Sequence, residues 1–263
     1  MEFESLELPE IGEEDSVGGL IRERFEEFDD DPEVVCVAST VVSKSEGRTR
    51  SLGEFEPSER AVRVSERIAS STDSDEVDPR FVEAVLGETV ELLIEEPFLL
   101  SVTDFGHVAP NAGVDRSNVE GEEKVLLLPK EPRESARRIR QEVGVPVIVT
   151  DTCGRPFRRG QTGVAVGWSG VEAVLDSRGE KDLHGRELEA TEEAVVDEIA
   201  GGANLVMGEG GRGTPVVGVS GVEDLLPDGD GDGGNPESLY RSKEDDIVRQ
   251  ALLERKEKGQ EQG

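Results

Sequence analysis

Short apolar runs bounded by turn residues recur along the chain, and stretches with helical periodicity lie between them. Short runs rich in Val, Ile and Leu are typical of buried strands, and five such runs span residues 34–42, 98–102, 124–128, 145–150 and 215–219. Apolar residues at spacings of three and four predict helices over residues 16–28, 58–69, 79–95, 135–143 and 186–207, the last starting near Thr191. This mixture predicts an α/β (mixed α+β) fold.

The C-terminal part has a different pattern. Residues 227–236 read PDGDGDGGNP, an acidic, glycine-rich loop, and residues 242–258 have a charged helical pattern. Asp228, Asp230, Asp232 and Gly233 match the opening of an EF-hand calcium loop, but Leu239 occupies the twelfth position, where a bidentate Glu belongs. A solvated, mobile loop is therefore favoured, inserted into a catalytic unit over residues 1–253. Residues 254–263 are predicted to form a charged flexible tail.

Charge excludes one large class of functions. The 263 residues include 60 Asp and Glu against 29 Lys and Arg, a net charge of −31, and 34% are hydrophobic. Such a chain repels nucleic acid. Lysine occurs only seven times, and a surface rich in acids and poor in Lys suits a halophilic cytoplasm. An acidic interaction surface is the alternative interpretation.

Compartment follows from other absences in the sequence. Two cysteines are too few for a disulfide framework. No apolar stretch approaches the roughly 20 residues of a membrane helix, and the acidic N-terminus is unlike a signal peptide. We therefore expect a soluble, cytoplasmic protein with no membrane partner.

Two clusters of polar residues could bind phosphate or a cation. Ser39, Thr40 and Lys44 lie in and directly after the strand predicted over residues 34–42, and hydroxyl and ammonium groups suit phosphate oxygens. A strand-end turn with a solvated Lys is the alternative. Residues 111–118 hold two amides, Asp115 and a glycine. They suit a hard cation or a nucleotide, although turn chemistry also explains Asn and Gly.

Residues 150–160 form the most suggestive cluster, since Asp151 and Thr152, at the end of a β-branched run, supply oxygen ligands for magnesium or manganese. Arg155, Arg158 and Arg159 follow within five residues. Such a basic island in an acidic chain indicates an anionic substrate. Pairing of these arginines with surface acids is the alternative.

A glycine-rich segment, residues 207–214, can bring backbone N–H groups close to phosphates and includes Glu209 as a cation ligand. A helix C-cap also explains these glycines. The segment follows a predicted helix and precedes a strand, which is neither P-loop nor Rossmann order, and GxxxxGK[ST] is absent.

Only two histidines, His107 and His184, are present and GxSxG is missing, which argues against zinc or triad chemistry. Cys153 is better explained by packing than as a nucleophile. What remains is typical of metal-assisted phosphoryl chemistry.

Six segments, in order, resemble the coenzyme F-420-0:L-glutamate ligase family, the γ-glutamyl ligases of the deazaflavin coenzyme. They read LPEIGEED, ASTVVSKSEGR, PNAGVDRSNV, TDTCGRPFRRGQTGVAVG, DSRGEKDLHGRELEAT and NLVMGEGGRGTPVV, starting at residues 8, 38, 110, 150, 176 and 204. The resemblance extends to about Leu253 and to halophilic archaeal members. It implies a family-specific fold and a homodimer. Cys153 takes a variable place in DT-x-GR, and Ser45 stands where Ala is expected.

The resemblance also implies the ligands and their residues. Asp115 and Asp151 would hold one divalent cation, Mg²⁺ or Mn²⁺, and Thr152 and Glu209 a second, with K⁺ as a further ion. The residues that would line a GTP site are Leu8, Pro9, Glu10, Ile11, Ser39, Thr40, Lys44, Asn118, Met207, Gly208, Glu209, Gly210, Gly211, Arg212, Gly213 and Thr214.

The activity implied is GTP-dependent amide formation. A terminal carboxylate of the F-420 precursor would become an acyl phosphate, and L-glutamate would then displace phosphate, with further glutamates added through γ-linkages. Lys44 would neutralise charge on the transferred phosphoryl group. Charge and position suggest that Arg155 and Arg158, with Arg159, hold substrate anions. Two alternatives stay open: another two-metal phosphoryl-transfer enzyme, or a non-catalytic acidic nucleotide-binding protein.

Overall fold

The chain forms two compact units. A computed structural model describes residues 1–263 except 73–76, 118, 120, 228–230 and 261–263. Unit 1 consists of Met1–Ser45 and Lys130–Leu239, and unit 2 of Glu46–Pro129 and Tyr240–Gly263. Most of unit 2 is therefore a single insertion into the chain of unit 1. The prediction that residues 1–253 act as one catalytic unit stays a prediction.

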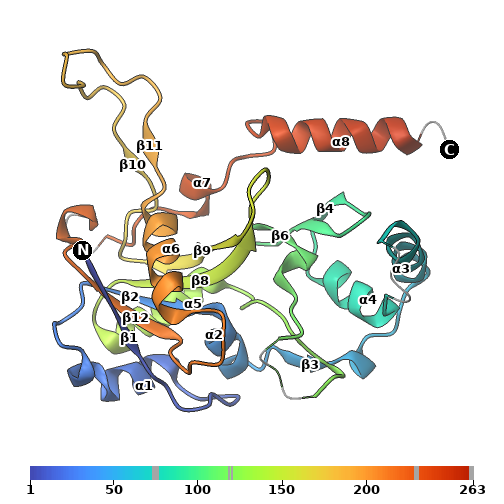
Figure 1. The fold of residues 1–263 in the computed structure, drawn as a ribbon, viewed down its shortest axis with the longest axis horizontal. Coiled ribbons are helices and arrows are strands. Elements are labelled where there is room, and N and C mark those ends of the chain that lie inside the picture. Colours follow the sequence, from blue (N-terminus) through green and yellow to red (C-terminus); the bar gives the residue numbers. More distant parts are fainter. Residues whose placement is uncertain (73–76, 118, 120, 228–230, 261–263) are drawn as a thin grey trace. The chain divides into compact units, whose positions relative to one another are not determined.

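A five-stranded sheet with the order β1–β12–β2–β8–β9 forms the centre of unit 1 (Figure 1). Its strands are β1 (Glu2–Leu6), β2 (Val34–Ala38), β8 (Val147–Gly154), β9 (Gln161–Ser169) and β12 (Val216–Ser220). Only β2 and β8 run parallel; the other neighbours in this sheet are antiparallel. This mixed topology confirms the predicted α/β (mixed α+β) class, and it is neither a P-loop nor a Rossmann arrangement.

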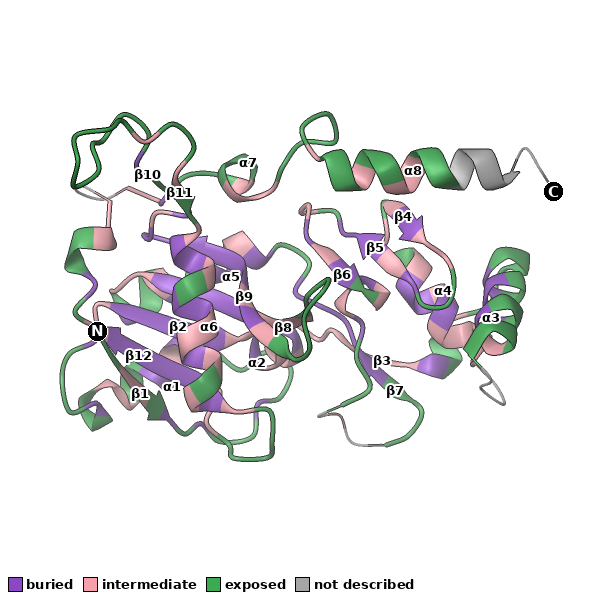
Figure 2. Cartoon of the chain, turned by 45° about the horizontal axis from the view of Figure 1, so that its top comes forward, coloured by how far each residue is buried: buried purple, intermediate pink, exposed green. Residues whose placement is uncertain are grey.

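Helices cover both faces of this sheet (Figure 2). One face packs on α6 (Val195–Met207), and their shared core includes the fully buried Trp168. The other face packs on α2 (Ser39–Ser45) and α5 (Pro132–Val143), with α1 (Val17–Glu23) against α5. The short strands β10 (Leu175–Asp176) and β11 (Glu192–Glu193) pair at the base of a projecting loop. The other elements of the unit are the 3-10 turns η1 (Phe25–Glu27) and η4 (Glu223–Leu225) and the helix α7 (Pro236–Leu239).

Three sequence predictions in unit 1 need correction. The strand predicted over residues 34–42 ends at Ala38. The next residues form a helix, α2, and Val41 and Val42 are buried as part of that helix, although β-branched side chains favour strands. The strand predicted over 145–150 runs on to Gly154, so Asp151 and Thr152 lie in a strand and not in a loop. The helix predicted from about Thr191 begins at Val195, after β11.

Unit 2 packs helices against small sheets. Its elements are β3 (Thr49–Ser51), η2 (Leu52–Glu54), α3 (Glu59–Thr72), α4 (Pro79–Gly87), β4 (Glu91–Ile94), β5 (Leu100–Val102), β6 (Val108–Pro110), η3 (Asn111–Gly113), β7 (Lys124–Leu126) and α8 (Ile247–Gln260). Strand β3 pairs with β7, and β4, β5 and β6 form a three-stranded sheet. The helix predicted over 79–95 is wrong in its second half, because the helix ends at Gly87 and residues 91–94 pair with β5 as a strand.

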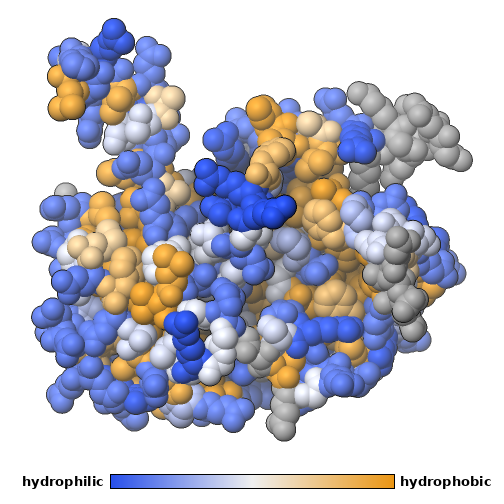
Figure 3. Space-filling view, viewed as in Figure 1, coloured by the Kyte–Doolittle hydropathy of each residue, from blue (hydrophilic) through white to orange (hydrophobic). Residues whose placement is uncertain are grey.

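Hydrophilic residues dominate the face shown in Figure 3, in keeping with the acidic composition. Among the residues described, no helix combines the length and the apolar character needed to cross a bilayer.

Asp232 and Gly233 of the acidic loop are anchored to α5 and β9, which corrects the expectation of a solvated loop for these two residues. Asp232 forms ion pairs with three arginines of α5, Arg133 at 3.1 Å, Arg137 at 2.6 Å and Arg140 at 3.9 Å, and accepts a hydrogen bond from Ser169 Oγ at 2.6 Å. The indole N–H of Trp168 donates to the carbonyl of Gly233 at 2.8 Å. Asp228 and Asp230 lie outside the described residues. The Asp232 carboxylate therefore faces guanidinium groups instead of forming part of a calcium loop.

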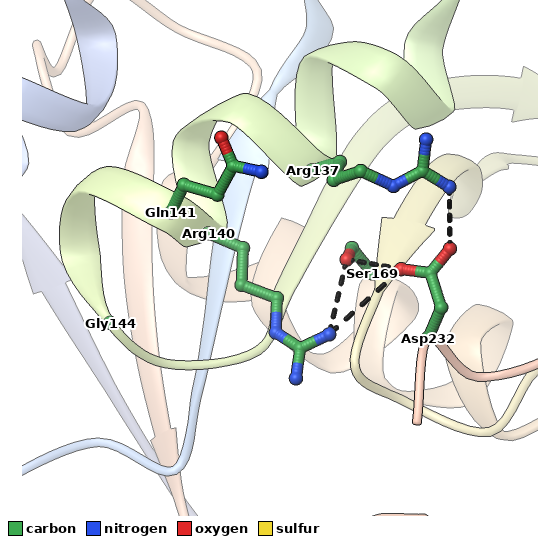
Figure 4. A pocket seen from close by; sticks show the side chains of 6 residues that line it. All are labelled: Arg137, Arg140, Gln141, Gly144, Ser169 and Asp232. Atoms are coloured by element: carbon green, nitrogen blue, oxygen red, sulfur yellow. Dashed lines mark hydrogen bonds and ion pairs between the residues drawn. The ribbon is translucent and has the colours of Figure 1, made fainter. Parts of the chain in front are cut away.

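A cavity of about 670 Å³ lies beside this anchor, lined by Arg137, Arg140, Gln141, Gly144, Ser169 and Asp232 (Figure 4). Ser169 is at the end of β9 opposite the hairpin that joins β8 to β9. The cavity contains none of the residues predicted to bind ligands.

Gly233 gives a test of how firmly the loop is held. Its φ is +78°, and a Cβ there would overlap the carbonyl oxygen of Val171. We expect Gly233→Ala to lower the free energy of unfolding by more than about 3 kcal/mol, because the loop or the segment that follows β9 has to move. Gly185→Ala is the matched control: its φ is +81°, but no atom lies within 4 Å of the added Cβ. It should cost about 1 kcal/mol. Equal losses in urea unfolding would contradict the close packing.

His107 is a buried titratable group in unit 2. Its ring stacks on Phe105 with 6.2 Å between ring centroids, and burial lowers its pKa to about 4. No described residue accepts or donates a hydrogen bond at its Nε2. The unfolded chain binds a proton near pH 6.5 and the folded unit only near pH 4. Stability from this group is therefore complete above pH 6.5 and decreases as the pH falls toward 4.

We expect the free energy of unfolding of unit 2 to fall by up to about 3 kcal/mol between pH 6.5 and pH 4. His107→Gln should flatten this slope, since glutamine does not titrate. His184→Gln is the control, because His184 is exposed and is the only other histidine. Urea titrations at several pH values measure the slope. A slope that His107→Gln leaves unchanged would rule out this histidine as its source.

Candidate functional site at the ends of β2 and β8

The parallel pairing of β2 and β8 brings two predicted site residues together. Ala38 lies opposite Thr150 in the register, so the next residues, Ser39 and Asp151, leave the pair side by side. The hydroxyl of Ser39 donates to Asp151 Oδ1 at 3.0 Å. Ser39 is buried and Asp151 is half-buried. A carboxylate and a hydroxyl, 112 residues apart in sequence, therefore form one polar pair where β2 ends beside β8.

Thr152 belongs to the opposite face of the sheet, because successive residues of a strand point to opposite faces. Its hydroxyl lies 3.0 Å from Glu209 Oε1 and 3.2 Å from Asn204 Oδ1. Asn204 is in the last turn of α6 and Glu209 follows that helix. Asp151 and Thr152 thus face different neighbours, and the prediction that they serve separate cations stays a prediction.

The glycine-rich segment, residues 207–214, connects α6 to β12 at this same end of the sheet. Gly208 and Gly213 have φ of +69° and +72°, values that favour glycine. The carbonyl of Gly213 accepts a hydrogen bond from the N–H of Leu8 at 3.2 Å, which ties the predicted residues 8–11 to the segment. Leu8 and Ile11 are buried, whereas residues 209–213 are exposed. The N–H of Arg212 donates to the carbonyl of Gly210 at 2.7 Å, so the exposed glycines at 210, 211 and 213 are the ones whose N–H groups are open to a ligand.

Thr40 and Lys44 lie on α2, which starts directly after β2. Both are half-buried, and Lys44 is in the last turn of the helix. Among the described residues no acid forms an ion pair with Lys44. Its ammonium group is therefore available to an anion at this end of the sheet.

The predicted basic island forms the turn of the β8–β9 hairpin. Residues 155–160 separate the two strands, and Arg155, Arg158 and Arg159 are all exposed. None of them forms an ion pair within the described part of the chain. The alternative in which these arginines neutralise surface acids is thus without support. Phe157, fully exposed with a φ of +64°, lies between them.

Asp115 lies in unit 2, two residues after the end of η3. Its Oδ1 accepts hydrogen bonds from the N–H groups of Arg116 at 2.7 Å and Ser117 at 3.0 Å, and the Ser117 hydroxyl contacts its other oxygen. These bonds are those of an Asx turn. Because Asp151 belongs to unit 1, a cation shared by the two acids stays a prediction. Asn118 lies outside the described residues.

The donor set fits a hard cation in its chemistry. Both polar pairs offer carboxylate and hydroxyl oxygens, and Mg²⁺ is usually held by one or two carboxylates together with phosphate oxygens and water. Within the described residues, no group of three or more His, Cys, Asp and Glu side chains could hold a metal ion alone. The pairs would therefore hold a cation together with an anionic ligand.

Two neighbours of the site were not found by sequence reasoning. Asn204 and Asp197 are seven residues apart on α6, so they lie on the same face of the helix. Burial raises the pKa of the Asp197 carboxyl. The hydrogen bond that this carboxyl accepts from the N–H of Ala165 acts in the opposite direction and offsets only part of the increase. Burial, followed by the charges of Asp151 and Asp197, raises the pKa of the Cys153 thiol. A protonated thiol is a poor nucleophile, which supports the packing role predicted for Cys153.

Hydroxyl, carboxylate and glycine N–H groups gather at the ends of two parallel strands, and unpaired arginines lie in the adjacent hairpin. Groups of these kinds can bind phosphate oxygens. The chain belongs to the F420-0:gamma-glutamyl ligase family, whose model matches residues 5–221. The resemblance seen in the six sequence segments is thereby confirmed.

Relatives from several archaea share this similarity along nearly their whole length. The chain is 54% identical to the coenzyme F420:L-glutamate ligase of Natronomonas pharaonis, over 93% of each protein. It is 48% identical to the enzyme of the same name from Archaeoglobus fulgidus, over 93% of this chain and 94% of the relative. The corresponding protein of Methanocaldococcus jannaschii is 38% identical, over 95% and 97%. Similarity therefore covers both units.

Proposed function

We propose that this protein is a GTP-dependent ligase that joins L-glutamate to the coenzyme F-420 precursor and then extends the product through γ-linked glutamates. The observation that carries this proposal is the meeting of four motif segments at one end of the sheet. Ser39 contacts Asp151, Thr152 contacts Glu209, and Leu8 contacts Gly213. The family match and the names of the relatives support the same activity.

The reaction divides into two balanced steps. An oxygen of the precursor carboxylate attacks the γ-phosphorus of GTP, and the bond to the β-phosphate oxygen breaks to release GDP. The glutamate amine then attacks the acyl carbon of the resulting acyl phosphate. An amide bond forms, inorganic phosphate leaves, and the amine loses its proton to solvent or to a nearby base.

Charge is the main obstacle to this chemistry in a chain with a net charge of −31. Two divalent cations, when bound at the Asp115–Asp151 and Thr152–Glu209 ligands, would neutralise phosphate charge and orient the nucleotide. Lys44 would bind a phosphate oxygen, and residues 207–214 would donate backbone N–H groups to the triphosphate. Arg155, Arg158 and Arg159 would bind the carboxylates of glutamate and the phosphodiester of the precursor.

The remaining properties proposed here rest on the resemblance and on composition. We propose a homodimer in the cytoplasm of a halophilic cell, with K⁺ as a further ion. High similarity to relatives from halophilic archaea and the scarcity of lysine support the halophilic part.

One assay tests the activity. Purified protein is incubated with GTP, the F-420 precursor, L-glutamate and Mg²⁺ or Mn²⁺, and the products are measured by mass spectrometry together with GDP and phosphate. A ligase forms GDP and phosphate only when both acceptors are present. Phosphate release without them would indicate another two-metal phosphoryl-transfer enzyme. Nucleotide binding without turnover would indicate a non-catalytic protein.

Asp151→Asn tests the carboxylate of the first polar pair. We expect kcat to fall by about 10²–10⁴-fold, because a neutral amide does not balance the charge of a cation. Asp224→Asn is the matched control, since Asp224 is an exposed acid of the same unit, away from the strand ends. Turnover near that of the unaltered protein for Asp151→Asn, in either Mg²⁺ or Mn²⁺, would contradict the assignment.

Arg158→Ala tests the basic island. Loss of an anion-binding guanidinium should raise KM for glutamate or for the precursor by about 10-fold, while Arg158→Lys should recover part of the affinity. Arg63→Ala, in the exposed surface of α3, controls for the loss of one positive charge. Unchanged KM values for both substrates in Arg158→Ala would exclude this residue from substrate binding.

A further inference from the structure

The β8–β9 hairpin contains a β-bulge just before the two polar pairs. Val149 lies opposite Gly167, but Thr150 lies opposite Ala165, so Val166 is an extra residue in β9. An extra residue reverses the alternation of side chains along a strand. As a result, Trp168 on one side of the bulge and Ala165 on the other both pack in the core beneath α6.

Asp197 of α6 holds this bulge. The N–H of Ala165 donates to Asp197 Oδ1 at 2.8 Å. Asp197 is half-buried in the first turn of the helix, and no described Lys, Arg or His forms an ion pair with it. Burying a carboxylate costs free energy unless polar partners offset the loss of water. The observed partner is a backbone N–H at the bulge, which indicates that the carboxylate serves to fix the backbone there.

The face of α6 that carries Asp197 also contacts Thr152, a member of the Thr152–Glu209 pair. Gly163, the cross-strand partner of Thr152, allows the close approach, because a Cβ at Gly163 would overlap the carbonyl oxygen of Ala200. Asn204, seven residues after Asp197, contacts the Thr152 hydroxyl at 3.2 Å. Helix α6 is thus attached to the hairpin at two points, the bulge and Thr152, with a close backbone contact between them.

We propose that Asp197 is a positioning residue, which fixes the bulge in β9 and thereby the register that sets Thr152 beside Glu209. Asp197 acts through the hairpin and touches neither nucleotide nor cation. The inference rests on the proposed function in so far as Thr152 and Glu209 hold a cation there. A one-residue slip between the strands would turn Thr152 away from α6 and separate it from Glu209.

Two substitutions at Asp197 separate the hydrogen-bond acceptor from the charge. Asp197→Asn keeps an oxygen that accepts the N–H of Ala165 but removes the negative charge, whereas Asp197→Ala removes both. Glu198→Ala is the matched control: it removes the adjacent, exposed acid of the same first turn and so reports any effect of helix-dipole compensation.

Two measurements on the full-length protein test the proposal. Amide hydrogen exchange at Ala165 reports the bulge without any metal, and calorimetric titration with Mn²⁺ in the presence of GTP reports the Thr152–Glu209 pair. We expect Asp197→Ala to speed exchange at Ala165 by at least about 10-fold and to weaken Mn²⁺ binding by about 10-fold. Asp197→Asn should stay within about threefold of the unaltered protein in both measurements, and Glu198→Ala should change neither.

Other outcomes overturn the proposal in distinct ways. If Asp197→Asn loses Mn²⁺ affinity as severely as Asp197→Ala while the Ala165 amide stays protected, the charge and not the bulge is responsible. If Asp197→Ala exposes the Ala165 amide but leaves Mn²⁺ affinity intact, the register is not coupled to Thr152. If Asp197→Ala does not fold, the Mn²⁺ affinity of Asp197→Asn decides, since only a retained affinity agrees with the acceptor role.

Failure of the proposed function gives a different result. If the unaltered protein binds no Mn²⁺ in the presence of GTP, the cation site is contradicted, and with it the role proposed for Asp197 in positioning Thr152. Amide exchange at Ala165 would still show whether Asp197 fixes the bulge. Normal Mn²⁺ binding without any glutamate ligation would contradict the activity and leave the positioning role standing.

Discussion

The parallel pairing of β2 and β8 is the constraint on which the rest of unit 1 depends. Val35, Cys36 and Val37 of β2 lie against Val147, Ile148 and Val149 of β8, and all six are fully buried. A shift of one residue would exchange the two faces of each strand and break the packing against α6 and α5. The fixed register in turn determines that Ser39 and Asp151, the residues after the last parallel pair, are neighbours. The site is therefore a consequence of core packing, since no local motif places these two side chains together.

Arginine has two different roles in this acidic chain. The arginines of α5 are used inside unit 1, where Arg133 and Arg137 share the Asp232 carboxylate and Arg133 also lies over the ring of Trp168. Planar guanidinium groups suit such shared and stacked contacts better than ammonium groups. The hairpin arginines, by contrast, form no ion pair within the described residues. The contrast marks the hairpin as the place where positive charge faces outward, although the chain as a whole is strongly negative.

Sequence patterns predicted the existence of most elements and the composition of the site, but not its geometry. The strands around residues 147 and 216 follow from continuous β-branched runs, and α5 follows from its periodicity. The boundary at Ala38 could not be predicted, because Val41 and Val42 favour a strand locally and only their burial against the sheet selects a helix. Asp197 escaped notice because its role depends on a bulge, and a bulge arises from pairing between strands, which a single strand's pattern does not contain.

The order of the strands has a consequence for how the protein is made. Glu2 of β1 pairs with Ser220 of β12, so the first strand of the chain has no partner until more than 200 residues have followed it. Contacts this distant in sequence form slowly, because a long loop has to close before they contribute stability. Residues 46–129 lie in the sequence between the two segments of unit 1, and their strands β3 and β7 pair residues 49–51 with residues 124–126, a much shorter separation. On the ribosome, β3 and β7 can therefore pair before β12 has been made, so β1 is synthesised early but pairs only once β12 has followed it.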